Sequence, residues 1–317
     1  MTMNDGRLTL KDVGPIAPVV TPCERSGEID FSGFRAVCRE MVAAGCGGIF
    51  VAGSTGRGPW FTLAERVALC EAAAETVAGR AVLLAGCMAS GVPGMLEAAR
   101  AMAQAGADGA VATAPGYFRY DAQELESIFH TFADASPLPV VVYDIPEFTG
   151  HTVAVDTITH LARHGNVLGV KDSSADFERF ALLSEVLRDF PEFALLQGKE
   201  AFLAASLRLG AAGFVVSLIH LDPESFVALY RAVRSGDELR ADVLQAEVSA
   251  AIALVGGAIE KRPQSSTLFS LLDGALRGRG ACDNLLLDHE GETPAWLAET
   301  AQGAVACFQT RRPAAPG

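Results

Sequence analysis

The sequence contains little lysine and little positive charge. Its 25 basic residues include only four lysines, and 38 acidic residues leave a formal net charge of −13. A negatively charged protein repels the phosphates of nucleic acids and of anionic lipids. The composition therefore argues against a nucleic acid or a membrane as partner. The lysines are Lys11, Lys171, Lys199 and Lys261.

Motifs that would indicate a metal, a nucleotide or a hydrolase are also missing. The six histidines show no H-x-H spacing, and the seven cysteines form no C-x-x-C pair. The sequence has no G-x-S-x-G elbow, no Walker loop and no G-x-G-x-x-G after its first predicted strand. We therefore expect no metal site and no cofactor, which argues against a metal-dependent aldolase.

Long apolar runs and paired cysteines are lacking as well. No segment approaches the roughly 18 uninterrupted apolar residues of a membrane span, and the polar residues 1–12 contain no signal-peptide core. The cysteines are odd in number and scattered, as in proteins that keep their thiols reduced. These features predict a cytoplasmic protein.

A regular alternation of apolar and amphipathic segments fills residues 13–236. A T-x-x-E capping box at Thr62 opens one of the predicted helices. Continuously apolar strands between helices indicate parallel strands buried on both faces. Eight such units predict an α/β fold, a (β/α)₈ TIM barrel, in preference to a doubly wound sheet. The strands are predicted at residues 15–22, 48–52, 81–85, 108–113, 138–143, 167–171, 193–197 and 212–217.

Beyond residue 236 the strand pattern stops. Residues 239–259, 265–276 and 293–308 have the pattern of further helices. Residues 237–309 are therefore predicted to form a C-terminal helical extension of the barrel. Residues 1–12 are interpreted as a polar leader, and residues 310–317 as a disordered tail.

Polar residues gather where the predicted strands end, which is where enzymes of this fold carry their active sites. A lysine at a strand end can simply extend its amine to solvent. A buried lysine, in contrast, can lose its proton and attack a carbonyl group. Because other polar residues lie at the neighbouring strand ends, we favour the interpretation that Lys171 is a buried nucleophile. The set comprises Thr21, Ser54, Thr55, Tyr117, Tyr143, Asp144, Lys171, Asp172, Ser173, Gln197 and Ser217.

Two groups of neighbours fit the condensation of an amine with a ketone. This reaction requires proton transfers, and Tyr143, which ends the adjacent strand, has a titratable hydroxyl. The alternative is that Tyr143 only packs in the barrel. Ser54 and Thr55 lie in a Gly-x-x-Gly turn, whose hydroxyls and backbone N–H groups suit a carboxylate. An ordinary glycine-rich turn is the alternative there.

The strand-end motifs, in chain order, resemble those of one known family. They are Gly53-Ser54-Thr55-Gly56, Pro115-Gly116-Tyr117, Tyr143-Asp144-Ile145-Pro146, Gly169-Val170-Lys171-Asp172-Ser173 and Gly198. Each motif alone is unspecific, but the ordered set is specific. From about residue 13 to residue 297 the sequence resembles the dihydrodipicolinate synthase / N-acetylneuraminate lyase family of class I, Schiff-base-forming aldolases.

The resemblance implies roles for five residues. Lys171 would form a Schiff base with pyruvate or another 2-oxo acid. Tyr143 would act as general acid and base, and Thr55 would relay its proton. Ser54 and Thr55 would hold the carboxylate, and Tyr117 would complete the relay from a neighbouring subunit. The family also implies a homotetramer built as a dimer of dimers.

The resemblance also implies a substrate-binding set and a branch of the family. Ser217, the serine of the Gly-x-x-Gly turn and an apolar residue at 148 favour the lyase branch. Against it, Glu200-Ala201 only half matches the acidic pair of the lyases. The set comprises Ser54, Thr55, Ser173, Gly198, Ser217, Phe148, Arg57 and Glu200.

Three residues depart from the family pattern. Arg57 replaces a glutamate, Asp144 an asparagine and Phe148 an arginine. Arg57 and Asp144 could form an ion pair at the barrel mouth, or remain two independent solvated charges. Without such a pair, Arg57 would bind an anionic group of the second substrate. Phe148 cannot hold a second carboxylate, which predicts poor dihydrodipicolinate synthesis.

The resulting hypothesis is a lyase or synthase acting on small molecules. It would cleave or condense pyruvate, or another 2-oxo acid, with an aldehyde through a Lys171 Schiff base. Two alternatives remain open. One is a 2-keto-3-deoxy sugar acid dehydratase that uses the same imine, and the other is a non-catalytic sensor of 2-oxo acids.

Overall fold

The computed structural model describes residues 3–4, 7–24, 26–262, 265–278 and 295–309. The predicted tail, residues 310–317, lies outside the described residues. Within them, eight parallel strands close into a barrel in the order β10-β3-β4-β5-β6-β7-β8-β9. The predicted (β/α)₈ barrel is therefore confirmed. The strands are β3 (Gly14–Pro18), β4 (Gly48–Val51), β5 (Val82–Gly86), β6 (Gly109–Thr113), β7 (Val140–Asp144), β8 (Val167–Asp172), β9 (Ala194–Gln197) and β10 (Gly213–Phe214).

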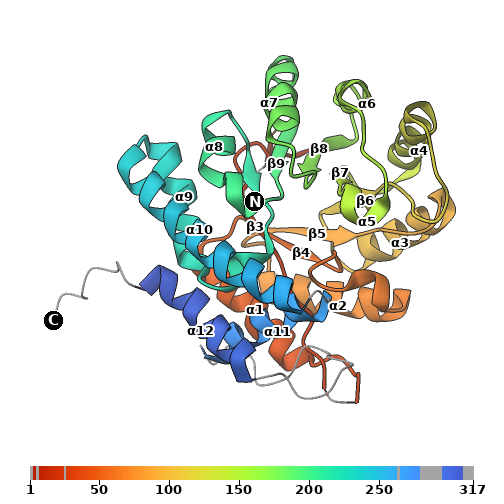
Figure 1. Cartoon of the computed structure of the whole chain (residues 1–317). Coiled ribbons are helices and arrows are strands. Elements are labelled where there is room, and N and C mark those ends of the chain that lie inside the picture. The colour runs from red at the N-terminus through yellow and green to blue at the C-terminus, as the bar shows by residue number, and fades with distance from the viewer. Residues whose placement is uncertain (1–2, 5–6, 25, 263–264, 279–294, 310–317) are drawn as a thin grey trace.

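Helices surround the barrel and connect successive strands (Figure 1). The predicted capping box is present at the start of α2, where Thr62 and Glu65 each bond the other's backbone N–H. The α-helices are α1 (Phe31–Ala44), α2 (Leu63–Val77), α3 (Val92–Gln104), α4 (Ala122–Ala135), α5 (Pro146–Thr149), α6 (Val155–Leu161), α7 (Phe177–Val186), α8 (Leu203–Arg208) and α9 (Pro223–Ser235). Short 3-10 turns are η1 (Gly58–Trp60), η2 (Leu187–Asp189), η3 (Glu200–Phe202) and η4 (Ser217–His220).

Side chains alternate between two apolar layers along each strand, as a period of two requires. On β7, Val141 and Tyr143 belong to the cluster that fills the barrel. Val140 and Val142 belong to the larger cluster between the barrel and its helices. The alternation therefore determines which strand-end residues face the interior of the barrel mouth.

The chain differs from the predicted pattern at both ends of the barrel. In the predicted leader, β1 (Met3–Asn4) and β2 (Arg7–Leu8) form a short antiparallel pair. The last strand is shorter than predicted, because the chain turns into η4 at Ser217. Two contacts hold this turn, one from the His220 ring to the Ser217 carbonyl and one from the Leu218 N–H to Glu200.

Three helices follow the barrel: α10 (Glu238–Lys261), α11 (Ser265–Gly278) and α12 (Ala295–Gln309). Helix α10 packs against α9 and α12 (Figure 1). Helix α11 packs against η4. By length and composition α10 could cross a membrane, with a mean hydropathy of 1.5. This is weak evidence, because packed helices of soluble proteins pass the same test, and α10 contributes Leu244, Val248 and Val255 to the core.

Candidate active site

Lys171 and Tyr143 lie side by side on neighbouring strands. They are register partners on β8 and β7, one residue before each strand ends. The Lys171 Nζ lies 3.9 Å from the centre of the Tyr143 ring and 5.6 Å from that of Phe50. Both side chains are buried, with 5% of Lys171 and 3% of Tyr143 exposed. The structure thus brings the predicted nucleophile and the predicted acid–base group together inside the barrel mouth.

The Lys171 amine has aromatic rather than acidic neighbours. Among the described residues, no carboxylate lies within ion-pair distance of its Nζ. The Tyr143 and Phe50 rings meet edge to face, with their centres 6.4 Å apart. Both rings lie next to the Lys171 amine. Burial of this lysine is therefore not explained by a structural salt bridge, which is the usual reason for a buried lysine.

The Gly-x-x-Gly turn folds tightly at the end of β4. Ala52 and Arg57 flank it with positive φ angles of 52° and 53°. A side chain at Gly56 would place its Cβ 2.8 Å from the Val19 carbonyl oxygen. The Thr21 hydroxyl donates to the Gly56 carbonyl at 2.8 Å. The turn is thereby tied to the end of β3 and holds its two hydroxyl residues at the mouth.

The hydroxyls of Thr55 and Ser217 lie 2.8 Å apart. This contact joins the β4 turn to η4 across the seam between the first and last parts of the barrel. Within the described part of the chain, the backbone N–H groups of Ser54 and Thr55 donate no hydrogen bond. Hydroxyls and unengaged N–H groups at one turn form the kind of concavity that binds a carboxylate.

Ser173 and Gly198 pack against each other at the ends of β8 and β9. The Gly198 N–H donates to the Asp172 carbonyl at 2.7 Å. A Cβ at Gly198 would lie 1.9 Å from the Ser173 Oγ. Only glycine fits here, so this position controls the shape of the strand end that carries Lys171.

Asp144 and Asp172, the residues after Tyr143 and Lys171, are both buried. Both carboxylates accept hydrogen bonds from Arg179 on α7. The pKa of Asp144 is raised to about 6, mainly by burial and to a smaller extent by the nearby charge of Asp172. Arg179 and the Val153 N–H act in the opposite direction and lower this pKa. Sequence reasoning missed Arg179, because a single arginine in an amphipathic helix gives no signal of burial.

The proposed pair between Arg57 and Asp144 is absent, and neither residue is a solvated charge. Asp144 pairs with Arg179 instead, because the alternation of β7 turns it away from the barrel interior towards α7. Arg57 is buried and lies over the Trp60 ring, 4.9 Å from its centre. Both interpretations of these charges were therefore wrong.

The remaining predicted residues lie around the mouth. The Glu200 carboxylate accepts the Leu218 N–H and so holds η4. Phe148 is 67% exposed on α5, and Tyr117 is 92% exposed with a φ of +82°. Within one chain the structure does not bring Tyr117 to Tyr143, and its role stays a prediction.

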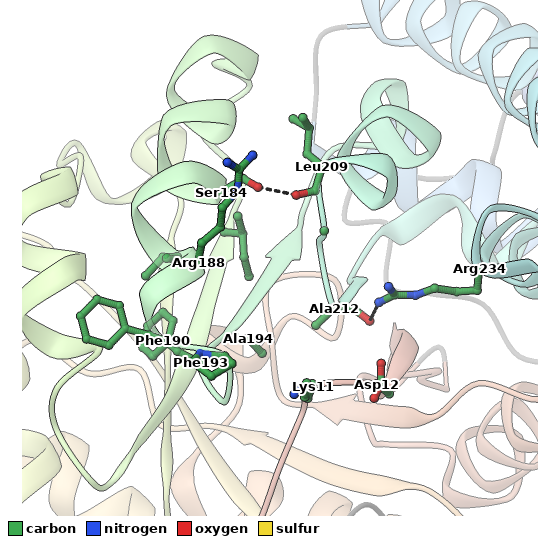
Figure 2. A pocket seen from close by; sticks show the side chains of 14 residues that line it. Lys11, Asp12, Ser184, Arg188, Phe190, Phe193, Ala194, Leu209, Ala212 and Arg234 are labelled. Carbon is green, nitrogen blue, oxygen red and sulfur yellow. Dashed lines mark hydrogen bonds between the residues drawn. The ribbon is translucent and has the colours of Figure 1, made fainter. Parts of the chain in front are cut away.

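A pocket of about 270 Å³ lies at the opposite end of the barrel, where β3, β9 and β10 begin (Figure 2). Lys11, Arg188 and Arg234 are among its lining residues. In Figure 2, Arg234 points towards the Ala212 carbonyl, to which it donates. The pocket includes none of the strand-end residues. Among the described residues, no group of three or more histidine, cysteine, aspartate or glutamate side chains could hold a metal ion.

Together these features define a (β/α)₈ barrel enzyme with a lysine–tyrosine pair at the carboxyl ends of its strands. The profile of the dihydrodipicolinate synthetase family matches residues 11–259. The chain belongs to this family, whose members are class I, pyruvate-dependent aldolases and lyases. It is therefore a carbon–carbon lyase or synthase of that class.

Relatives support the assignment along most of the chain. The 4-hydroxy-tetrahydrodipicolinate synthase 1 of Streptomyces coelicolor is 37% identical over 73% of this chain and 74% of its own length. An uncharacterized DapA-like lyase of Halobacterium salinarum is 34% identical over 74% of this chain and 76% of its own.

Solved structures have the same fold. Dihydrodipicolinate synthase from Bacteroides thetaiotaomicron superposes with a TM-score of 0.84 at 27% identity, covering 92% of this chain and 97% of that one. A prophage protein of the same family from E. coli K12, solved with pyruvate, has a TM-score of 0.85. At 24% identity over 93% of this chain and 98% of its own, it supports the fold alone.

Proposed function

We propose that the chain makes or cleaves a carbon–carbon bond next to pyruvate through a Schiff base at Lys171. The observation that carries this proposal is the buried Lys171 amine, 3.9 Å from the Tyr143 ring centre and without a carboxylate partner among the described residues. The relatives named as synthases, and the family to which the chain belongs, support the same chemistry.

The site residues divide the work of this reaction. The Lys171 amine attacks C2 of the 2-oxo acid, and the carbonyl oxygen leaves as water. Tyr143 supplies and removes the protons of this step, and Thr55, held by Ser217, relays them. The turn that carries Ser54 holds the carboxylate. Loss of a methyl proton gives an enamine that attacks the aldehyde, and water then hydrolyses the imine.

Trapping with borohydride tests the proposal. Pyruvate and borohydride together should give one stable adduct, located on Lys171 by peptide mass spectrometry. The matched control is Lys199, which extends towards Glu147 at the surface and should stay unmodified. A Lys171→Ala protein that still gains a full equivalent of adduct would refute the assignment. Release of water from a 2-keto-3-deoxy sugar acid without carbon–carbon cleavage would favour the dehydratase.

We propose further that the second substrate has no carboxylate at the position of Phe148. This exposed ring on α5 follows directly on the strand of Tyr143, and it offers neither charge nor donor. Loss of a charge-assisted contact costs about 2–5 kcal/mol at a desolvated site, roughly 30-fold or more in kcat/KM. An efficiency above ~10⁴ M⁻¹s⁻¹ with aspartate semialdehyde would contradict this; Phe148→Arg should improve it.

Compartment and assembly also belong to the proposal. Six cysteines are free in the described structure, which supports a cytoplasmic protein with reduced thiols.

We propose a homotetramer made of two dimers. Tyr117 and Phe118 on the loop after β6 and Phe148 on α5 are large, exposed aromatic residues at the mouth, and a second copy of the chain would cover them.

A further inference from the structure

The ends of β7 and β8 carry two pairs of residues that face opposite ways. Tyr143 and Lys171 are register partners that point into the barrel mouth. The next residues, Asp144 and Asp172, are also register partners. By strand alternation they point outward, towards the helix layer. The orientation of the inner pair is therefore mechanically linked to that of the outer pair.

Arg179 joins the outer pair. Its Nη1 donates to Asp172 Oδ2 at 2.5 Å, and its Nη2 donates to Asp144 Oδ2 at 2.7 Å. Nη2 also donates to the Val153 carbonyl at 2.5 Å. The second oxygen of each carboxylate accepts a backbone N–H, from Ser174 and from Val153. One planar guanidinium thus clamps both strand ends symmetrically, with a geometry that lysine cannot reproduce.

We propose that Arg179 is a positioning residue, which acts through Asp144 and Asp172 to hold the Lys171 amine in register with Tyr143. The inference rests on the proposed function, because it concerns the same amine. Misplacement of reacting groups by about 1 Å can cost on the order of 100-fold in rate. A clamp that fixes two adjacent strand ends prevents such misplacement.

The clamp also makes the site sensitive to pH. The buried carboxylates of Asp144 and Asp172 share one cation, Arg179. One positive charge does not balance two negative charges when both carboxylates are ionised. The charged groups packed against Asp144 are Arg179 from α7 and Asp172 from β8. Burial raises the pKa of Asp144 to about 6, and Arg179 opposes this increase. Below that pH the charge-assisted bond to Arg179 weakens, and with it the clamp.

The test measures two steps that need only pyruvate, since the aldehyde is unidentified. These steps are the rate of borohydride-trapped adduct formation and the exchange of pyruvate methyl protons in D₂O, followed by NMR. Arg179→Met should slow both by roughly 10- to 100-fold, with little change in the pyruvate concentration for half-saturation. Arg179→Lys should recover part of the rate. Arg208 bridges Glu238 and Asp242 at the surface, so Arg208→Met is the matched control and should keep the wild-type rates.

The pH profile distinguishes positioning from a purely structural role. The wild type should lose exchange activity below about pH 6. Asp144→Asn and Arg179→Met should both remove this dependence, because each variant lacks one partner of the bond that titrates. A folded Arg179→Met protein with wild-type rates and a wild-type pH profile would overturn the inference. An unchanged pH profile in Asp144→Asn would also overturn it. The Asp144→Asn variant provides the test if Arg179→Met fails to fold. A wild type that traps no pyruvate would instead refute the proposed function.

Discussion

At the scale of single residues, strand alternation places a reactive side chain and a supporting side chain at consecutive positions of the same strand. Tyr143 and Lys171 face the barrel interior, and Asp144 and Asp172 face the helices. The positions of Lys171 and Tyr143 could be predicted from the sequence, because both stand out at the ends of apolar strands. Arg179 could not be predicted in the same way, because its burial depends on how α7 packs over two strands.

Removal of one hydroxyl tests Tyr143. The variant Tyr143→Phe keeps the ring that packs on Phe50 but cannot transfer a proton. Turnover should fall by about 10²–10⁴-fold, as measured by steady-state kinetics, while the melting temperature stays close to that of the wild type. Tyr230→Phe, on α9, is the matched control. Unchanged kcat in Tyr143→Phe would mean that this tyrosine only packs.

The raised pKa of Asp144 has a consequence for stability. The pKa is about 6 in the folded protein against an ordinary value of 3.8, so the folded state binds this proton more tightly than the unfolded state. Stability from this group is present below pH 3.8 and is lost as the pH rises through 6. The unfolding free energy of Asp144→Asn minus that of the wild type should therefore be about 2–3 kcal/mol larger at pH 7 than at pH 4.

Urea denaturation of both proteins at a series of pH values measures this difference. The comparison within each pH cancels any constant effect of the substitution itself. A difference that does not change between pH 4 and pH 7 would mean that Asp144 titrates normally.

At the scale of elements, sequence reasoning found the strands and most helices but not the details of their ends. The capping box at Thr62 was predicted because it is local in sequence. The early end of β10 was not, since η4 depends on contacts from His220 and Glu200. Contacts between distant segments determine where such an element ends, and no local pattern encodes them.

The close approach of β8 and β9 provides a prediction at this scale. Gly198→Ala would place a Cβ 1.9 Å from Ser173 Oγ and 2.7 Å from the Asp172 carbonyl, so the strand end must shift. We expect activity to fall at least 10-fold, on the same positional argument as for the clamp, and the melting temperature to fall.

Gly165→Ala is the matched control for this prediction. Gly165 precedes the other end of β8, and a Cβ added there would meet no atom within 4 Å. Activity and thermal unfolding of the two variants should be compared side by side. Wild-type activity in Gly198→Ala would show that the strand ends tolerate displacement.

At the scale of the whole molecule, Tyr117 provides a test of the proposed assembly. Tyr117 is 92% exposed and its backbone has a φ of +82°, an unfavourable conformation for a tyrosine. If Tyr117 serves the site of a partner, a mixture of Tyr117→Phe and Lys171→Ala proteins should regain activity. Each mixed dimer would contain one site with Lys171 and with Tyr117 from its partner.

Native mass spectrometry should verify that mixed assemblies form. Activity of the mixture, compared with each variant alone, is the measurement. Mixed assemblies without recovered turnover would show that Tyr117 acts in its own chain or not at all.

The contact between Thr55 and Ser217 has a consequence for the order of folding. Its hydroxyls lie 162 residues apart in the sequence, and the adjoining seam pairs β3 with β10. Contacts of such separation form late, because a long loop must be closed first. Helices and the early strands can form while the ring is still open. Catalytic competence should therefore be the last property that a refolding chain acquires, and enzyme activity should appear after the helical circular dichroism signal.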